Sequence, residues 1–319
     1  PVKRSAFSGW QEGSNPRNMW FLTRKHFSSL PLKAFLKNRP WSGDYWPTHK
    51  GGVSYRWASP TRYDKNRWNY SRPGSGVILN NLSPIEKFDL YVGNQQFELT
   101  HMERERTGIF SSRKIPEWEG LCHAWAPATY LYKNPQTITV ETPKGKELTF
   151  YSSDIKALLT THLHYNKAPK TKFLGSRCNL DFSELEKQYK KGLLSREDMI
   201  YMMRRPECED TNPGAFHVVL TNFIGRLNRS FIIDKTRDLE VWNQPVYGYE
   251  STILKETPEV SRSSHPKTYK EVTLETVVYY ISEVPQTFNL SVNTNAVAAI
   301  TFKYTLELDR LGRIVGGSW

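Results

Sequence analysis

Three side chains that lie far apart in the sequence could together perform nucleophilic catalysis. Cys122 supplies a thiol, His217 an imidazole and Asp234 a carboxylate. A cysteine nucleophile reacts as its thiolate, a histidine takes up the proton, and an acidic side chain orients the histidine. We therefore predict that Cys122 attacks the substrate, that His217 is the general base and that Asp234 holds the base in place.

The residues around Cys122 predict a loop followed by a helix. Gly120 permits a tight turn, and the residues after Cys122 have a helix-like composition. This places the thiol at a helix start, where the helix dipole lowers the pKa of a cysteine. His123 is a poor candidate for the base, because neighbouring side chains on a helix point about 100° apart.

The segment 215–236 carries the strongest strand signal and predicts how His217 and Asp234 meet. A run of apolar residues leads to Gly225, and a second run leads back from Arg229. If the hairpin turns through residues 225–228, His217 and Asp234 become diagonal neighbours on one face, roughly 7–8 Å apart between Cα atoms. A register slip of one residue would place them on opposite faces.

The remaining pattern predicts a mixed α+β fold with an antiparallel sheet. Residues 1–80 are aromatic-rich and irregular, with Trp68 among the aromatic residues, which predicts short helices and loops. We further expect partial helix over 88–110, a hairpin over 137–150 and strands over 271–313. A helix is expected from Asp154 to about His164, capped by Ser152 or Ser153. Two short helices are expected over 183–205, with Ser195 as a cap. The expected organisation is an N-terminal region over 1–110, a catalytic core over 111–255 and a C-terminal β segment over 256–319.

The composition narrows the functional classes. Hydrophobic residues make up 38% and charged residues 24%, which indicates a folded chain rather than a disordered one. The net charge is +12, but no block of five or six like charges occurs, so we read the basic residues as a solvated surface and expect no nucleic-acid binding. No apolar run reaches the roughly 18–20 residues of a membrane span.

The three cysteines divide into a pair and a single thiol. Cys178 and Cys208 lie 30 residues apart around a helical segment, which predicts a disulfide and leaves Cys122 free. A disulfide implies an oxidising compartment, so we expect a secreted, periplasmic or cell-envelope protein. The alternative is three reduced cysteines in the cytoplasm. A zinc site at Cys178 and Cys208 has no CxxC pair to support it.

Two further groups could suggest metal binding. His162 and His164 are two residues apart in a predicted helix, so they do not share a face. The acidic stretch 207–210 could offer calcium ligands, but no loop of the EF-hand type is present, and a solvated loop is the simpler reading.

In several blocks, including those around Cys122 and His217, the sequence resembles the transglutaminase elicitors of oomycete cell walls and their bacterial relatives. The matching blocks occur in family order, and the chain ends in Gly-Gly-Ser-Trp, near the family's Gly-Gly-Glu-Trp. The blocks, each numbered by its first residue, are Trp46-Pro-Thr-His-Lys-Gly-Gly, Gly120-Leu-Cys-His-Ala-Trp-Ala-Pro-Ala, Asp154-Ile-Lys-Ala-Leu, Ser176-Arg-Cys-Asn, Asn212-Pro-Gly-Ala-Phe-His-Val-Val-Leu-Thr-Asn and Val241-Trp-Asn-Gln-Pro-Val.

The resemblance implies calcium-dependent protein–glutamine γ-glutamyl transfer on a cysteine-protease-like core, of papain-like or transglutaminase-like type. By motif, the nucleophile falls on Cys122 and the base on His217, while Asp234 follows from a looser match. The Val241–Val246 block is similar to the surface segment that plants recognise in the oomycete members. We interpret that block as a recognition segment and not as a catalytic element.

The predicted reaction joins a glutamine side chain to a lysine amine through a thioester on Cys122, so protein or peptide substrates bearing Gln and Lys are expected. The oxyanion needs hydrogen-bond donors. The backbone N–H of Cys122 is one candidate, and the aromatic residues Trp41, Tyr45, Trp46 and Trp125 are candidates for the oxyanion site or the substrate cleft.

Two rival functions remain open. The same three residues would serve a cysteine protease or deamidase, because the difference is whether water or an amine reaches the thioester. The other rival is a non-enzymatic secreted elicitor or binding protein.

Overall fold

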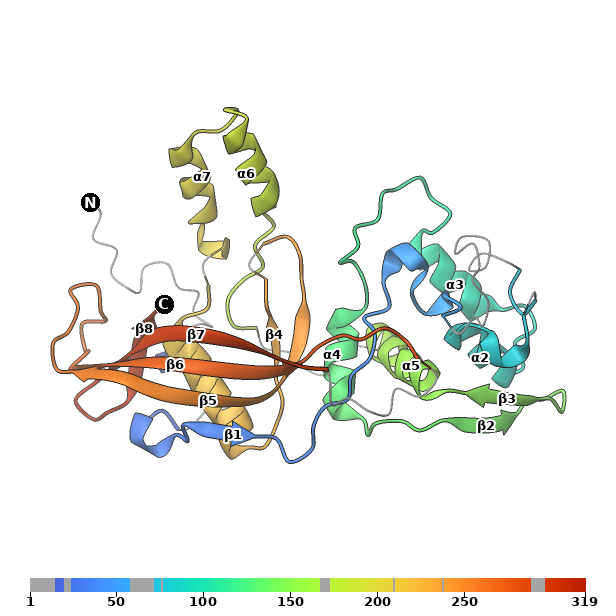
Figure 1. Cartoon of the computed structure of the whole chain (residues 1–319), viewed down its shortest axis with the longest axis horizontal. Coiled ribbons are helices and arrows are strands. Elements are labelled where there is room, and N and C mark those ends of the chain that lie inside the picture. The colour runs from blue at the N-terminus through green and yellow to red at the C-terminus, as the bar shows by residue number, and fades with distance from the viewer. Residues whose placement is uncertain are drawn as a thin grey trace.

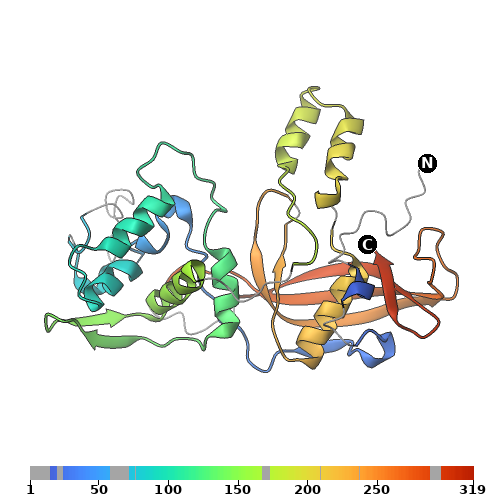
Figure 2. The ribbon, with the colours of Figure 1, turned by 180° about the vertical axis from the view of Figure 1, so that it is seen from behind.

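The structure is a computed structural model of the 319-residue chain. It describes residues 15–19, 24–57, 72–75, 77–166, 173–208, 210–236, 238–287 and 296–319, so Trp68 lies outside the described residues. Two bodies lie side by side, one built on a large antiparallel sheet and one largely helical, with α4 (Cys122–Leu131) between them (Figures 1 and 2). The fold is a mixture of helices and antiparallel sheet, as the sequence predicts.

The large sheet has six strands, five of which follow the order β1-β5-β6-β7-β8, while β4 pairs with the outer edge of β5. Its long strands run almost without interruption, because β-branched and apolar residues alternate with polar ones along them. The predicted boundary at residue 256 falls inside β5, and the sheet continues across it into β6. The strands are β1 (Lys33–Phe35), β4 (Ile232–Asp234), β5 (Asn243–Thr257), β6 (Lys270–Ile281), β7 (Val297–Leu308) and β8 (Ile314–Ser318).

Helix α8 (Pro213–Leu220) packs on this sheet and is buried along its whole length. The strand predicted over residues 215–224 is therefore wrong. Asn212 caps the helix by accepting the N–H groups of Gly214 and Ala215, and Pro213 occupies its first turn. The run of valines resembles a strand because a fully buried helix has no polar face to give it a 3.6-residue period.

Two of the motifs that carry the family resemblance pack against each other at the start of α8. A Cβ atom on Gly214 would lie 2.5 Å from the carbonyl oxygen of Gly316 in β8, so a side chain there would collide with the backbone. Asn212 also donates its side-chain amide to Gly317 O at 3.3 Å. The C-terminal Gly-Gly-Ser-Trp motif therefore serves to seat α8 on the sheet.

The helical body contains α2 (Pro84–Tyr91), α3 (Glu98–Thr107), α5 (Ser152–Tyr165) and the hairpin of β2 (Ile138–Glu141) and β3 (Glu147–Phe150). The hairpin and the α5 helix confirm the sequence prediction, although Tyr151 and not a serine precedes α5. A fully buried ion pair joins Lys87 of α2 to Asp154 of α5 at 2.5 Å. Breaking one partner of such a pair costs about 3–5 kcal/mol, so this contact fixes the two helices together.

A helical hairpin of α6 (Phe182–Lys190) and α7 (Arg196–Met203) projects from the large sheet (Figure 1). Ser195 caps α7 as predicted, by accepting the N–H of Asp198. The remaining short elements are 3-10 helices and one π-helix. They are η2 (Pro16–Asn18), η3 (Phe27–Ser29), η4 (Thr48–Lys50), η5 (Gly52–Ser54), η6 (Leu79–Asn81), η7 (Pro206–Cys208) and the π-helix η8 (Thr221–Arg226).

Candidate active site

Cys122 is the first residue of α4 (Cys122–Leu131), which confirms the predicted position of the thiol. Cys122 is the free cysteine of the chain, and 5% of its surface is exposed to solvent. Leu121 donates its backbone N–H to Tyr45 O at 2.6 Å, which ties the helix start to a neighbouring segment. Gly120 makes this approach possible, because a Cβ atom there would lie 2.5 Å from the ring of Tyr45.

Two residues at the start of β5 hold the sulfur of Cys122. Sγ donates to Val241 O at 3.4 Å, and the side-chain amide of Asn243 donates to Sγ at 3.6 Å. The backbone N–H of Asn243 also lies close enough to the sulfur to lower the pKa of the thiol. The Val241–Val246 block, which the resemblance suggests to be a recognition segment without a catalytic part, thus begins in direct contact with the nucleophile.

Asp234 shapes the loop that brings these residues to Cys122. It ends β4, where it pairs with Asn243 of β5. Its Oδ1 accepts the backbone N–H of Trp242 at 2.9 Å and the hydroxyl of Thr236 at 2.9 Å. Asp234 therefore belongs to the site, but its hydrogen bonds are made with its own loop and not with a histidine.

The electrostatics of the site oppose ionisation of the thiol. Burial raises the pKa of Cys122, and the negative charges of Glu283 and Asp234 raise it further. The two hydrogen bonds from Asn243 act in the opposite direction, because they favour the thiolate. The balance leaves the pKa of the thiol above its ordinary value, so the resting sulfur is protonated at neutral pH.

Two carboxylates from different segments, those of Asp44 and Glu283, lie close together, and Glu283 also acts on the thiol. The backbone N–H of Val284 donates to Gly43 O at 3.0 Å, which sets Glu283 next to Asp44. Gln244 is fully buried and donates its side-chain amide to Glu283 at 2.5 Å. Part of Asp44 reaches solvent, yet burial of its carboxyl raises its pKa to about 7.

A strained turn holds Asp44 in position. Its carboxylate accepts the backbone N–H groups of Tyr45 and Trp46. Trp46 has a φ of 51°, in the left-handed region that a bulky residue rarely adopts. Such strain persists only where the surrounding structure enforces it, and it concentrates at functional sites. The edge of Tyr45 also contacts Trp242, with ring centroids 5.4 Å apart.

His217 does not lie beside Cys122. It sits on α8 with none of its surface exposed, and its ring contacts Phe27 and Tyr304. All eight histidines of the sequence are among the described residues, and none of them is hydrogen-bonded to the thiol. The predicted hairpin between His217 and Asp234 is wrong, because residues 213–220 are helical.

A buried chain of hydrogen bonds explains the position of His217. Its Nδ1 lies 2.7 Å from the hydroxyl of Tyr304 on β7, which lies 2.9 Å from Thr276 on β6. Thr276 in turn lies 2.8 Å from Ser251 on β5. Among the described residues His217 Nε2 has no partner, and burial lowers the pKa of the imidazole to about 3. His217 thus joins α8 to three strands as a neutral core residue.

The predicted aromatic donors are mostly core residues. Trp41, Trp46 and Trp125 are each at most 2% exposed and belong to two apolar clusters. Trp41 donates its indole N–H to Tyr132 O at 3.0 Å, so that donor is already used. Of these four aromatic residues, Tyr45 lies near the thiol. Its hydroxyl donates to Glu117 O at 2.6 Å, so that donor is also already used.

The other candidate metal groups do not form a site. His164 pairs with His123 of α4 at 2.9 Å, whereas His162 lies within hydrogen-bonding distance of Asn166. In the described part of the chain, no group of three or more His, Cys, Asp or Glu side chains could hold a metal ion. Calcium binding stays a prediction from the resemblance, and Glu209 of the acidic stretch 207–210 lies outside the described residues.

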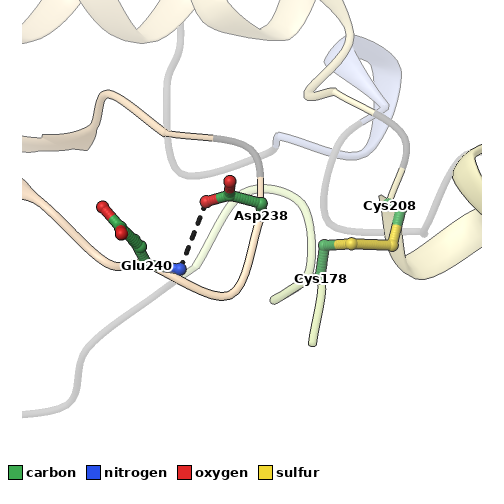
Figure 3. Close-up of a disulfide and its surroundings, with 4 residues drawn as sticks. All are labelled: Cys178, Cys208, Asp238 and Glu240. Carbon is green, nitrogen blue, oxygen red and sulfur yellow. Dashed lines mark hydrogen bonds between the residues drawn. A yellow bond between two sulfur atoms is a disulfide. The ribbon is translucent and has the colours of Figure 1, made fainter. Parts of the chain in front are cut away.

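Cys178 and Cys208 form the predicted disulfide. It lies at the base of the α6–α7 hairpin, next to the loop that carries Asp238 and Glu240 (Figure 3). Leu239 in this loop donates its backbone N–H to Leu180 O at 3.0 Å, two residues beyond Cys178. The disulfide thus borders the same loop that reaches the thiol through Val241.

Comparison with known proteins places these features in a family. A family model described as transglutaminase elicitor matches residues 98–319. The fold is similar to the crystal structure of the GP42 transglutaminase from Phytophthora sojae, with a TM-score of 0.69 and 21% identity, over 97% of this chain and 86% of that chain. No curated protein sequence matches. Because the family model covers more than half of the sequence, this chain belongs to the transglutaminase elicitor family.

Proposed function

We propose that the protein is a protein–glutamine γ-glutamyltransferase that works through a thioester on Cys122. The observation that carries the proposal is the free thiol at the start of α4, held by Asn243 and close to the carboxylates of Glu283 and Asp234. A thiol in this position suits nucleophilic attack on a carboxamide. Membership of the transglutaminase elicitor family supports the same chemistry.

The reaction would proceed in two halves. The sulfur attacks the carboxamide carbon of a glutamine, the carbon–nitrogen bond breaks, and ammonia leaves with one added proton. A lysine amine then attacks the thioester carbon and gives up a proton, the carbon–sulfur bond breaks, and the thiolate returns. The product is an isopeptide bond between the two side chains.

Asp44 is the group we propose for the proton transfers that the sequence assigned to His217. Its pKa of about 7 lets the carboxyl both donate and accept a proton at neutral pH. It precedes Tyr45, whose carbonyl is bonded to the residue directly before Cys122. His217 is enclosed in the core and has no exposed surface through which it could meet a substrate.

The charge around the thiol favours an amine over water in the second half of the reaction. Glu283 and Asp234 provide negative charge near the sulfur, and such a site attracts a cationic lysine side chain. This charge supports transfer to an amine over hydrolysis by a protease or deamidase. The disulfide supports a location in an oxidising compartment, and no helix of the described chain could cross a membrane.

The test is incorporation of a labelled primary amine into a glutamine-containing protein. We expect uptake by the natural chain and complete loss in Cys122→Ala. The matched control is His123→Asn, which alters the neighbouring residue but not the sulfur contacts, and it should keep activity within a few-fold of the natural chain.

Each rival function predicts a different result in the same assay. Release of ammonia without amine uptake would establish a hydrolase instead. Equal biological activity of the natural chain and Cys122→Ala, with no product in either, would establish a binding or elicitor protein.

A further inference from the structure

Asn243 is distinguished from the other residues of the site by touching the reacting atom with two donors. Its side-chain amide donates to Sγ of Cys122 at 3.6 Å, and its backbone N–H lies close enough to the same sulfur to lower the pKa of the thiol. Both hydrogen bonds favour the charged form of the sulfur. In a site whose carboxylates oppose ionisation, Asn243 supplies the stabilisation that the thiolate needs.

The surrounding contacts fix Asn243 in this position. It pairs with Asp234 across the β4–β5 ladder, and the preceding Trp242 is bonded to Asp234 through its backbone N–H. On the other side, Val241 O accepts the thiol hydrogen. The donor is therefore preorganised by the sheet and costs no rearrangement when charge develops.

We propose that Asn243 is a catalytic residue whose side-chain amide stabilises first the thiolate of Cys122 and then the oxyanion of the tetrahedral intermediate. When sulfur bonds to the carboxamide carbon, the oxygen becomes the second atom from the sulfur. A donor that already reaches the sulfur then lies within reach of that oxygen. The thiolate role stands without the proposed function, whereas the oxyanion role rests on it.

The backbone N–H of Cys122 would be the second donor, because it lies at the open first turn of α4. This assignment replaces the aromatic residues predicted from the sequence, whose donors are buried or already bonded. It also gives the Val241–Val246 block a catalytic part.

The thiolate role is tested by the rate of alkylation of Cys122 with iodoacetamide as a function of pH. The natural chain offers one free thiol, so the measurement reports on this residue alone. Asn243→Ala should lower the rate at neutral pH by about ten- to hundredfold, since a hydrogen bond to a charged group is lost. The pH at which the thiol titrates should move upward by about one to two units, the logarithm of the same factor.

Two further variants make the alkylation experiment decisive. Asn243→Asp keeps the shape but removes the N–H donor and adds a negative charge, so its pH profile should shift at least as far. Trp242→Phe alters the same loop without touching the sulfur, and its profile should match the natural chain. An unchanged profile in a folded Asn243→Asp or Asn243→Ala would overturn the proposal, with thermal unfolding as the check on folding.

The oxyanion role is tested by amine incorporation. At a pH where the thiolate is fully formed, Asn243→Ala should still lose about 10²–10³ in kcat with KM within a few-fold. A kcat fully restored at that pH would overturn the oxyanion role and leave the thiolate role. Failure of the natural chain to incorporate amine would overturn the proposed function, while the alkylation result would still decide the thiolate role.

Discussion

Opposed electrostatic influences meet at the sulfur of Cys122. Burial and the charges of Glu283 and Asp234 raise the pKa of the thiol, while the two donors of Asn243 lower it. The thiol is therefore kept protonated until something changes the balance.

The charge of Asp234 can be separated from its place in the loop. Asp234→Asn keeps an oxygen that can accept the Trp242 N–H but removes the negative charge, so the pKa of the Cys122 thiol should fall. Because Asp234 is exposed, we expect only about a two- to fivefold rise in the alkylation rate at neutral pH, diminishing at high salt.

Asp238→Asn is the matched control for this experiment. Asp238 lies in the same loop and accepts the N–H of Glu240, so its replacement should leave the alkylation rate unchanged. If Asp234 oriented a histidine base, as the sequence suggested, Asp234→Asn would slow the reaction. A slower alkylation in that variant would therefore contradict a purely electrostatic influence of Asp234 on the thiol.

At the scale of elements, the site depends on a loop between two strands. The β4–β5 loop reaches the thiol at one end and is bonded to Leu180 through Leu239 in its middle. Leu180 follows Cys178, whose disulfide closes the base of the α6–α7 hairpin. The hairpin and its disulfide therefore brace the loop from outside.

Replacing both cysteines of the disulfide, in Cys178→Ser with Cys208→Ser, should loosen this brace. The bond closes a loop with a sequence separation of 30. Its loss should lower the free energy of unfolding by roughly 3–4 kcal/mol, on the entropic account of such loops. Amide hydrogen exchange of the segment 238–243 should become faster, whereas exchange in β6 should change little.

Ser195→Ala serves as the control at the far end of the same hairpin. It removes the N-cap of α7 at a cost of about 1 kcal/mol and leaves the disulfide intact. Exchange of the segment 238–243 should then stay as in the natural chain. Unchanged exchange in the cysteine double variant would show that the hairpin does not brace the loop.

For the molecule as a whole, the site forms where two bodies meet. Helix α4 brings the nucleophile, while the loop of the large sheet brings Asn243 and Val241 to it. The sheet body is held together by the buried polar chain from Ser251 to His217. His217 thus supports the site through the stability of the fold.

The pH dependence of stability should reveal this role of His217. Burial lowers the pKa of the imidazole from 6.5 to about 3, so between these values the unfolded chain binds a proton that the folded chain does not. The stability that His217 contributes is therefore complete above pH 6.5 and is lost as the pH falls. The free energy of unfolding should fall by up to about 1.4 kcal/mol per pH unit.

His217→Gln removes this titration, so urea unfolding should show a flatter dependence on pH over the same window. Tyr304→Phe is the control. It keeps a buried imidazole and hence the slope, but it should cost about 1–3 kcal/mol at neutral pH through the lost hydroxyl. An undiminished slope in His217→Gln would mean that another group carries the proton uptake. A folded His217→Gln should also keep its alkylation rate at Cys122.

The sequence by itself determined the features that depend on local pattern. The helix start at Cys122, the hairpin over 137–150, the cap at Ser195 and the long strands after residue 270 follow from turn residues, caps and alternation. The pairing of Cys178 with Cys208 followed from their spacing around a helical segment, which left Cys122 as the odd thiol. Membership of the family was visible in motifs that follow one another in order.

Only the tertiary structure decided which residues surround the thiol. Asn243 and Glu283 come from segments far apart in the chain, and no spacing rule connects them to Cys122. The sequence pattern misplaced His217 because an apolar run reads alike as a buried strand and as a buried helix, and the two place a side chain on different faces. Burial on all sides erases the periodicity that would tell them apart, so the packing of α8 on the sheet settles where its imidazole lies.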